Sequence, residues 1–154
     1  MHIPSLTILL PVYNESARIQ QGISQAVYLR TQLSDFFSTI EILVVDDGST
    51  DDSLSLICDD SIQILRRPHL GKGATVRAGL THSQTDWVVF SDIDWSVPVD
   101  TVQQLIRYGL EHTHKMVIAS REIDGSTRIA EPPWRHILGK LFNRWVQWVL
   151  LAGY

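Results

Sequence analysis

The sequence contains a single cysteine, Cys58, among 154 residues. No disulfide can form within the chain, so a reducing compartment is compatible with it. No apolar stretch reaches the roughly 20 residues of a membrane-spanning helix. The first residues also lack the basic region and long apolar segment of a signal peptide. From these absences we expect a cytoplasmic protein.

Basic residues are fewer than acidic ones: 13 lysines and arginines stand against 17 aspartates and glutamates, which gives a net charge of −4 and a pI near 5.8. This balance argues against a general nucleic-acid binder, so we expect no nucleic-acid partner. Glycine is missing after the first apolar run, where a nicotinamide-dependent oxidoreductase would carry Gly-x-Gly-x-x-Gly. The chain has Pro-Val-Tyr-Asn-Glu at 11–15 instead and no glycine before Gly22. The Gly-Lys-Gly segment at 71–73 is not a P-loop, because Arg66 stands at its first glycine position and Gly73 replaces its hydroxyl residue.

Apolar residues make up 44% of the chain, which suffices for one buried core and one domain. Short apolar runs alternate with segments of helical periodicity, and this alternation predicts right-handed crossovers and a mostly parallel sheet. We expect strands at 6–12, 40–45, 62–65, 87–91 and 116–119. We expect helices at 16–34, 50–58, 98–111 and 133–154, and another that begins at 71–73. A capping box, Ser49 with Asp52, supports the helix at 50–58.

Polar clusters follow four of these expected strands. They are residues 11–15, 46–49, 92–94 and 120–121. Ligands of open parallel sheets bind outside the carboxyl ends of the strands, so these clusters should meet at one edge. An aromatic ring can stack on a base there, carboxylates can accept from base and ribose, and arginine can pair with phosphate. The combination favours a nucleoside diphosphate as ligand.

The third cluster holds two aspartates, Asp92 and Asp94, directly after an apolar run. Residues two apart on an extended segment point the same way, so both carboxylates can face one cation. Mg²⁺ favours such oxygen ligands and leaves positions for substrate phosphates. An aspartate pair after a strand is also often only a turn and a helix cap. The other clusters favour the metal site.

Five segments, in this order, resemble family-2 glycosyltransferases, and within that family the polyprenyl-phosphate (dolichyl-phosphate) glucosyl- and mannosyltransferases. The segments are PVYNE at 11–15, VVDDGSTD at 44–51, GKGATVRAG at 71–79, SDIDWSVP at 91–98 and SR at 120–121. The resemblance implies the GT-A fold, a Rossmann-like α/β/α sandwich with a mostly parallel central sheet. It spans essentially the whole chain, which we therefore expect to be a single nucleotide-sugar-binding domain at residues 1–154.

Position by position, the resemblance implies a nucleotide site and a metal site. The expected nucleotide-binding residues are Pro11, Tyr13, Glu15, Asp46, Asp47, Lys72, Asp92 and Ile93. The expected ligands of Mg²⁺ or Mn²⁺ are Asp92, Asp94 and Ser96, and the expected catalytic residues are Asp92, Asp94, Arg121 and Arg135. Trp95 departs from the leucine that is commoner in the family. The histidines show no ligand spacing.

The reaction that the resemblance implies is inverting transfer of a sugar from a nucleotide donor to a polyprenyl or dolichyl phosphate. UDP-glucose is the first choice of donor and GDP-mannose the second. Relatives carry an acceptor-side Asp-x-x-x-Gly-Phe-like segment that would follow Tyr154, so we expect the chain to be the N-terminal part of a catalytic domain. A nucleotide-sugar-binding module without acceptor machinery is the alternative, and a nucleotidyltransferase is chemically related.

Several site residues also have purely structural interpretations. Tyr13 could pack on the following helix, Lys72 could lie in a solvated loop, and Arg121 could pair with a neighbouring carboxylate. The expected last helix carries an apolar and tryptophan-rich stripe together with basic residues at 134–154. That stripe suits either packing on the rest of the protein or peripheral contact with an anionic membrane, at its cytoplasmic face.

Overall fold

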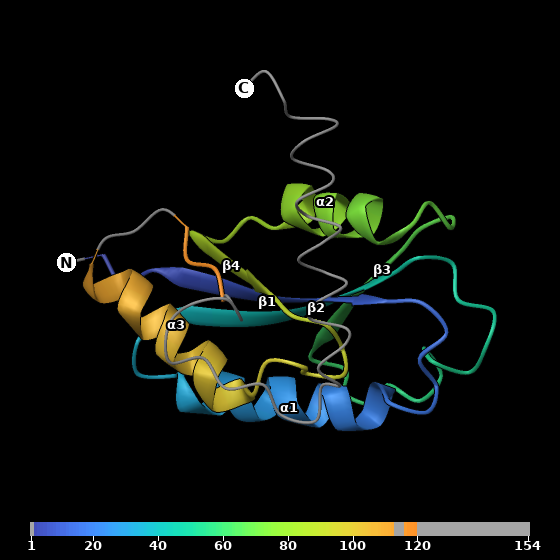
Figure 1. Cartoon of the computed structure of the whole chain (residues 1–154), viewed down its shortest axis with the longest axis horizontal. Coiled ribbons are helices and arrows are strands. Elements are labelled where there is room, and N and C mark those ends of the chain that lie inside the picture. Colours follow the sequence, from blue (N-terminus) through green and yellow to red (C-terminus); the bar gives the residue numbers. More distant parts are fainter. Residues whose placement is uncertain (1, 113–115, 120–154) are drawn as a thin grey trace, which may run out of the picture. The chain divides into compact units, whose positions relative to one another are not determined.

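The computed structural model describes residues 2–112 and 116–119 (Figure 1). Four strands and three helices alternate along this part of the chain: β1 Ser5–Val12, α1 Ile19–Gln32, β2 Thr39–Asp46, β3 Ile62–Arg66, α2 Lys72–His82, β4 Trp87–Phe90 and α3 Val99–Glu111. The strands form one sheet in the order β3-β2-β1-β4, and every pairing is parallel. The expected α/β class with a mostly parallel sheet is therefore confirmed.

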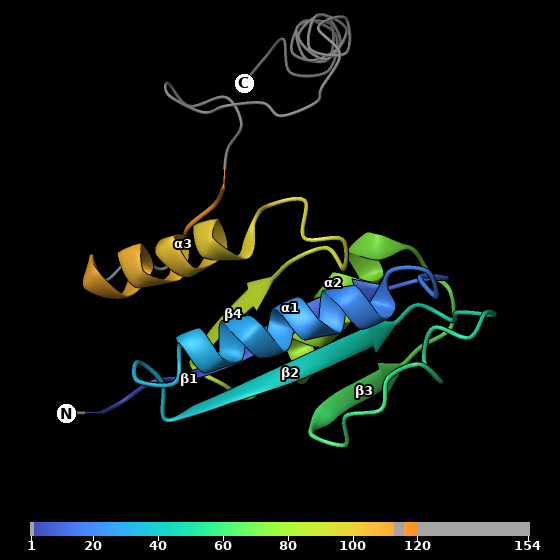
Figure 2. The same cartoon turned by 90° about the horizontal axis from the view of Figure 1, so that it is seen from below.

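Helices cover both faces of the sheet, with α2 on one face and α1 and α3 on the other (Figures 1 and 2). Successive side chains of a strand point to opposite faces, so each buried strand serves two cores. Ile8 and Ile42 pack with the residues of α1 and α3, whereas Leu9, Leu43 and Val45 pack under α2. Burial on both faces explains why the strands read as continuous apolar runs.

The expected helix at 50–58 is wrong, because the chain forms turns there. The expected capping box does not form, since the Ser49 hydroxyl accepts a hydrogen bond from the backbone N–H of Asn14, 2.9 Å away. Asp51 holds the local turn through the backbone N–H (3.0 Å) and the hydroxyl of Ser53. Side-chain bonds to the backbone have replaced the start of a helix.

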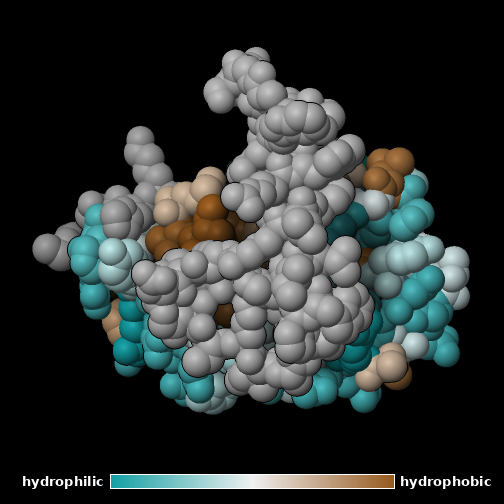
Figure 3. All heavy atoms as spheres, in the orientation of Figure 1, coloured by the Kyte–Doolittle hydropathy of each residue, from teal (hydrophilic) through white to brown (hydrophobic). Residues whose placement is uncertain are grey.

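The expected strand at 116–119 is also wrong, because these residues have no regular structure. Met116 and Ile118 are 76% and 71% exposed, so alternate side chains of the run are not buried. Figure 3 shows apolar surface over β4 and this segment. An apolar run becomes a strand only where another strand pairs with it, and no described strand does so here.

No helix in the described part of the chain combines the length and apolar character needed to cross a bilayer. Residues 133–154, where the sequence predicts a final helix, lie outside the described residues.

Candidate functional site

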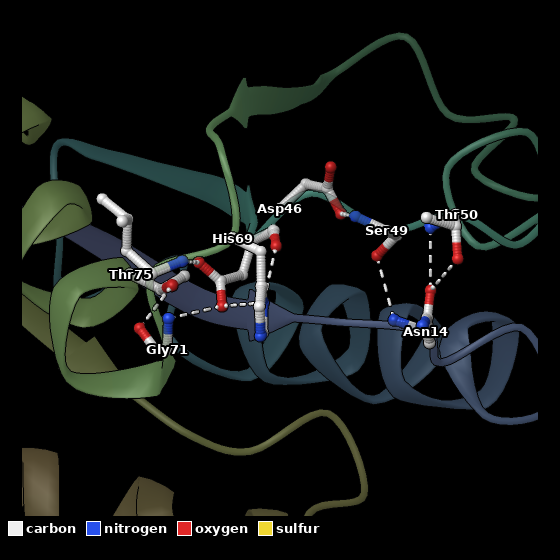
Figure 4. Close-up of polar contacts among 9 residues, drawn as sticks. Asn14, Asp46, Ser49, Thr50, His69, Gly71 and Thr75 are labelled. Atoms are coloured by element: carbon white, nitrogen blue, oxygen red, sulfur yellow. Dashed lines mark hydrogen bonds and ion pairs between the residues drawn. The ribbon is translucent and has the colours of Figure 1, made fainter.

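The loops after β1 and β2 are tied together by hydrogen bonds (Figure 4). The backbone N–H of Thr50 donates to Asn14 Oδ1 at 2.8 Å, and the backbone N–H of Glu15 donates to Ser53 Oγ at 2.7 Å. Asn14 has φ = 52°, a left-handed conformation that asparagine adopts more readily than most residues. These bonds connect two loops that lie about 35 residues apart in the sequence.

Asp47 holds the turn that precedes α2. Its Oδ1 accepts the backbone N–H of Leu70 at 3.0 Å, and its Oδ2 accepts that of Gly71 at 2.9 Å. Burial by itself raises the pKa of this carboxyl, but the bonds from Leu70, the Thr75 hydroxyl and Gly71, together with the charge of His69, outweigh burial. The pKa of Asp47 therefore lies below its usual value. An ionised carboxylate thus fixes the position of the Gly-Lys-Gly segment.

Tyr13 and His69 stack on each other, with ring centroids 4.1 Å apart and planes 23° from parallel. His69 Nδ1 lies 2.8 Å from Asp47 Oδ2 and 3.1 Å from the Asp47 backbone oxygen. Tyr13 is 43% exposed, and the side chain of His69 is 55% exposed. The alternative that Tyr13 packs on the following helix is not what the structure shows: its ring partner is a histidine from the loop after β3.

The Asp-x-Asp segment, residues 92–94, is a turn. The expectation that Asp92 and Asp94 point the same way had assumed an extended segment. The backbone N–H of Trp95 donates to the Asp92 carbonyl at 3.0 Å, which closes the turn. Asp94 Oδ1 accepts the backbone N–H of Ser96 at 3.0 Å. Lys72 Nζ lies 2.5 Å from Asp92 Oδ1, so Lys72 is paired at the site and not merely solvated.

This turn is anchored on α1. Trp95 is buried, has φ = 50°, and donates its indole N–H to the Gly22 carbonyl at 2.9 Å. A Cβ at Gly22 would lie 2.4 Å from the Ile93 backbone oxygen, so only glycine allows this approach. The tryptophan that departs from the family's usual leucine thus has a structural role at this position.

Most of the residues predicted for the nucleotide site line one pocket of about 300 Å³. Of the predicted residues, it is lined by Pro11, Tyr13, Glu15, Asp47, Lys72, Asp92, Ile93 and Asp94. Asp46 does not line it; this buried carboxylate accepts the Ser49 backbone N–H at 3.1 Å. Ser96 is exposed beside Asp94, and Arg121 and Arg135 lie outside the described residues.

Among the lining residues that the sequence did not predict as site residues, two have ionisable side chains, Arg18 and His69. Arg18 donates from Nε and Nη2 to Glu15 Oε2, each at 2.7 Å. It also lines a second pocket of about 440 Å³, which shares Ile93 and Asp94 with the first. The position of His69 held a usable signal, because His69 follows β3 and the carboxyl ends of all four strands meet at this edge.

A parallel α/β domain with acidic and aromatic groups at the carboxyl edge of its sheet is typical of nucleotide-binding proteins. The family described as Glycosyl transferase family 2 matches residues 7–150. The chain belongs to this family.

Two curated relatives carry names that specify a lipid-phosphate acceptor. The dolichyl-phosphate beta-glucosyltransferase of Trichomonas vaginalis is 32% identical over 150 residues, which cover 89% of this chain and 44% of the relative. The undecaprenyl-phosphate 4-deoxy-4-formamido-L-arabinose transferase of Sodalis glossinidius is 30% identical over 113 residues, which cover 69% of this chain and 34% of the relative. The chain thus spans less than half the length of these two proteins.

Solved structures agree on the fold. A mannosyltransferase from Pyrobaculum calidifontis, in complex with GDP-Man and Mn²⁺, matches with a TM-score of 0.54 and 24% identity, over 70% of this chain and 33% of that protein. Glucosyl-3-phosphoglycerate synthase from Mycobacterium tuberculosis, in complex with Mn²⁺, UDP and glucosyl-3-phosphoglycerate, matches with a TM-score of 0.53 and 26% identity, over 70% and 39%. The GT-A fold expected from the sequence is confirmed.

Proposed function

We propose that this chain binds a nucleotide sugar and forms part of a metal-dependent inverting glycosyltransferase with a polyprenyl or dolichyl phosphate as acceptor. The observation that carries the proposal is the shared pocket: Asp92 and Asp94 line the same cavity as Tyr13, Asp47 and Lys72. Family membership and the names of the two curated relatives support this choice of reaction. UDP-glucose is the first choice of donor and GDP-mannose the second.

The residues present fit a divalent cation such as Mg²⁺ or Mn²⁺. Residues 2–112 and 116–119 contain no group of three or more His, Cys, Asp or Glu side chains that could hold a metal alone. Two carboxylates suffice where substrate phosphates complete the coordination, as is usual for Mg²⁺. Asp94 and Asp92 would hold the ion, with Ser96 as a third candidate, and the bound ion would neutralise charge on the diphosphate.

Two cations of the chain lie at the same pocket. Lys72 pairs with Asp92, and Arg18 pairs with Glu15 next to Asp94. Both cations can also attract the phosphates of a donor, because a carboxylate and a phosphate offer the same kind of oxygen acceptor. We expect Arg121 and Arg135 to add to this charge.

In the proposed reaction an oxygen of the acceptor phosphate forms a bond to the anomeric carbon of the sugar. The bond from that carbon to the diphosphate oxygen breaks, and its electron pair leaves with the nucleoside diphosphate. Attack from the face opposite the leaving group inverts the configuration. A phosphate acceptor is already anionic near neutral pH, so the site needs positive charge around the leaving group more than a strong general base.

A transfer assay tests the proposal directly. The 154-residue chain would be incubated with UDP-glucose or GDP-mannose, a short polyprenyl phosphate and Mg²⁺, with and without EDTA. We expect a glycosylated lipid product only when metal is present. Metal-dependent donor binding without any transfer would instead identify a nucleotide-sugar-binding module. Failure to bind either donor would contradict both functions.

Peripheral membrane contact through residues 134–154 belongs to the same proposal, because a lipid acceptor must reach the site. These residues lie outside the described part of the chain. The test is sedimentation of the protein with anionic vesicles at low salt, where basic residues attract the surface most strongly. Protein that stays in the supernatant would remove membrane contact from the proposal and leave the sugar transfer intact.

A further inference from the structure

Residues 61–85, which form β3 and α2, include several basic side chains and no aspartate or glutamate. The cations of this segment are Arg66, Arg67, Lys72 and Arg77, although the whole chain has a net charge of −4. α2 covers the face of the sheet opposite to α1 and α3 (Figure 1). Positive charge is thus concentrated in one strand–helix unit of an acidic protein. Of these cations, only Lys72 has a place in the proposed reaction.

A groove of about 800 Å³, here called the α2 groove, lies between α2 and the end of β3. It is lined by Leu65 and Arg67 on the side of β3 and by Ala74, Arg77 and Ala78 of α2, among others. The α2 residues in this lining are three or four positions apart, so they form one stripe along the helix. None of the described residues that line the groove is acidic. The groove therefore offers apolar surface together with two guanidinium groups.

Neither Arg67 nor Arg77 forms an ion pair with a carboxylate in the part of the chain that the structure describes. Arg18, Arg30 and Lys72, by contrast, all do so. A guanidinium group without a carboxylate partner can donate two parallel hydrogen bonds to a phosphate. The two arginines of the α2 groove are therefore available to an anionic ligand from outside the described residues.

Two exposed leucines extend this surface. Leu70, which lines the groove directly before α2, is 63% exposed, and Leu80 near the end of α2 is 48% exposed. Leu80 follows Arg77 by three positions, so the two side chains are neighbours on the helix. Arginines near an edge strand can also serve to keep other chains from pairing with it, but exposed leucines do not serve that purpose. Leucine next to arginine suits the boundary between head groups and acyl chains of an anionic bilayer.

The α2 groove begins beside the nucleotide pocket. Gly71 and Lys72 line the pocket, and their neighbours in the chain, Leu70 and Gly73, line the groove. A bilayer that contacts the groove would therefore lie close to the pocket. This is where a lipid phosphate would have to arrive if it is the acceptor.

We infer that the surface formed by β3 and α2 docks the protein on an anionic lipid bilayer. Arg67 and Arg77 bind lipid phosphates, and Leu70 and Leu80 enter the boundary between head groups and acyl chains. The choice of a bilayer as the partner rests on the proposed function, in which the acceptor is a lipid. This contact is separate from the one proposed for residues 134–154.

The experiment is sedimentation of the whole chain at low salt with phosphatidylcholine vesicles that contain about one third phosphatidylserine. One double variant, Arg67→Gln with Arg77→Gln, removes both guanidinium groups, and a second, Leu70→Ser with Leu80→Ser, removes the apolar side chains. The matched controls are Arg107→Gln, at an exposed position of α3, and Ile3→Ser, at a residue that is 56% exposed before β1. Thermal unfolding shows whether each variant is folded, and calorimetry with UDP and Mg²⁺ shows whether the nucleotide pocket is intact.

We expect each lost arginine to weaken vesicle binding about fivefold, so the arginine double variant should bind roughly twenty- to thirtyfold more weakly. The leucine double variant should bind several-fold more weakly, because less apolar surface enters the bilayer. Both controls should bind vesicles like the unaltered chain. The arginine double variant should keep its affinity for UDP, since neither arginine lines the nucleotide pocket.

Undiminished vesicle binding by the folded arginine double variant would overturn the inference and assign the membrane contact to another part of the chain. Undiminished binding by the leucine double variant, or release of the protein by soluble glycerophosphoserine, would identify a site for soluble phosphate compounds and also overturn it. An unaltered chain that binds UDP but does not sediment with vesicles would overturn this inference alone. Failure to bind either UDP or vesicles would count against the proposed function as well.

Discussion

At the scale of single residues, the carboxylates at the edge of the sheet divide into two kinds. Asp46 and Asp47 are buried and accept backbone N–H groups, so they hold the loops in place. Asp92 and Asp94 are more exposed, and both line the pocket. Removing a carboxylate of the first kind should affect stability, and removing one of the second kind should affect binding.

Asp94→Asn should weaken Mg²⁺-dependent binding of UDP at least about tenfold, because even residues that support a metal ligand typically change affinity by that amount. The free energy of unfolding should change little, since the side chain is exposed. Calorimetry with and without Mg²⁺ measures the first effect and urea denaturation the second. Asp35→Asn, at an exposed residue after α1, is the control. Unchanged metal-dependent affinity would count against Asp94 as a ligand.

Asp47→Ala should lower the free energy of unfolding by about 1–3 kcal/mol, because it leaves buried N–H groups without their acceptor. It should also weaken nucleotide binding in EDTA, since the turn before Lys72 and the ring of His69 lose their support. Urea denaturation and calorimetry without metal check the two parts. If nucleotide affinity stays the same while stability falls, Asp47 serves the turn alone.

At the scale of elements, the site depends on how closely the Asp-x-Asp turn approaches α1. The contact combines the hydrogen bond from the Trp95 indole to Gly22 with the absence of a Cβ at that glycine. The helix thereby fixes the position of both aspartates. A loop that is positioned by a rigid helix needs less ordering when a ligand binds.

Two glycine-to-alanine substitutions test this close approach as a matched pair. Gly73→Ala in α2 should raise the free energy of unfolding by about 0.5–1 kcal/mol, because a Cβ there meets no atom within 4 Å and alanine favours the helix. Gly22→Ala gains the same propensity but places its Cβ 2.4 Å from the Ile93 oxygen, so it should be destabilising. Urea denaturation of both variants measures the contrast. Equal effects would mean that α1 and the turn are not in this contact.

At the scale of the whole molecule, several carboxyls with lowered pKa values make stability depend on pH. The pKa values of Asp47, Asp51, Asp59 and Asp86 all lie below the usual 3.8. The hydrogen bond from the Ser53 hydroxyl is the main reason that the pKa of Asp51 falls to about 2, and bonds from Ser16 and from the Ser53 backbone add to it. A lowered pKa in the folded state means that the unfolded chain binds protons first.

The contribution of these four carboxyls to the free energy of unfolding should therefore be fully present above about pH 5 and should be lost as the pH drops from about 4 toward 2. Urea denaturation at about pH 7, 4 and 3 measures this trend. Asp51→Asn removes one of the contributing groups and should flatten the slope, whereas Asn at the exposed Asp35 should leave the slope unchanged. Stability that rises on acidification would contradict the assignment of these carboxylates as ionised acceptors.

The sequence by itself determined the parallel α/β class, the four strands that the structure contains, and most of the pocket. Burial on both faces of a sheet demands continuous apolar runs, and the carboxyl ends of parallel strands must meet at one edge. Both features can be recognised from neighbouring residues in the sequence, as an apolar run or as polar residues next to one. The order of the strands and polar clusters along the chain therefore suffices to predict one shared site for a set of residues: Tyr13, Asp47, Lys72, Asp92 and Asp94.

Only the tertiary structure decided what depends on contacts between distant segments. The ring of His69 stacks on Tyr13, and the indole N–H of Trp95 donates to the carbonyl of Gly22. The Ser49 hydroxyl accepts the backbone N–H of Asn14 and does not cap a helix. These contacts join segments that lie about 35 to 73 residues apart in the chain. Composition and periodicity describe only neighbours along the chain, so such pairings follow from the packed sheet and helices rather than from any local pattern.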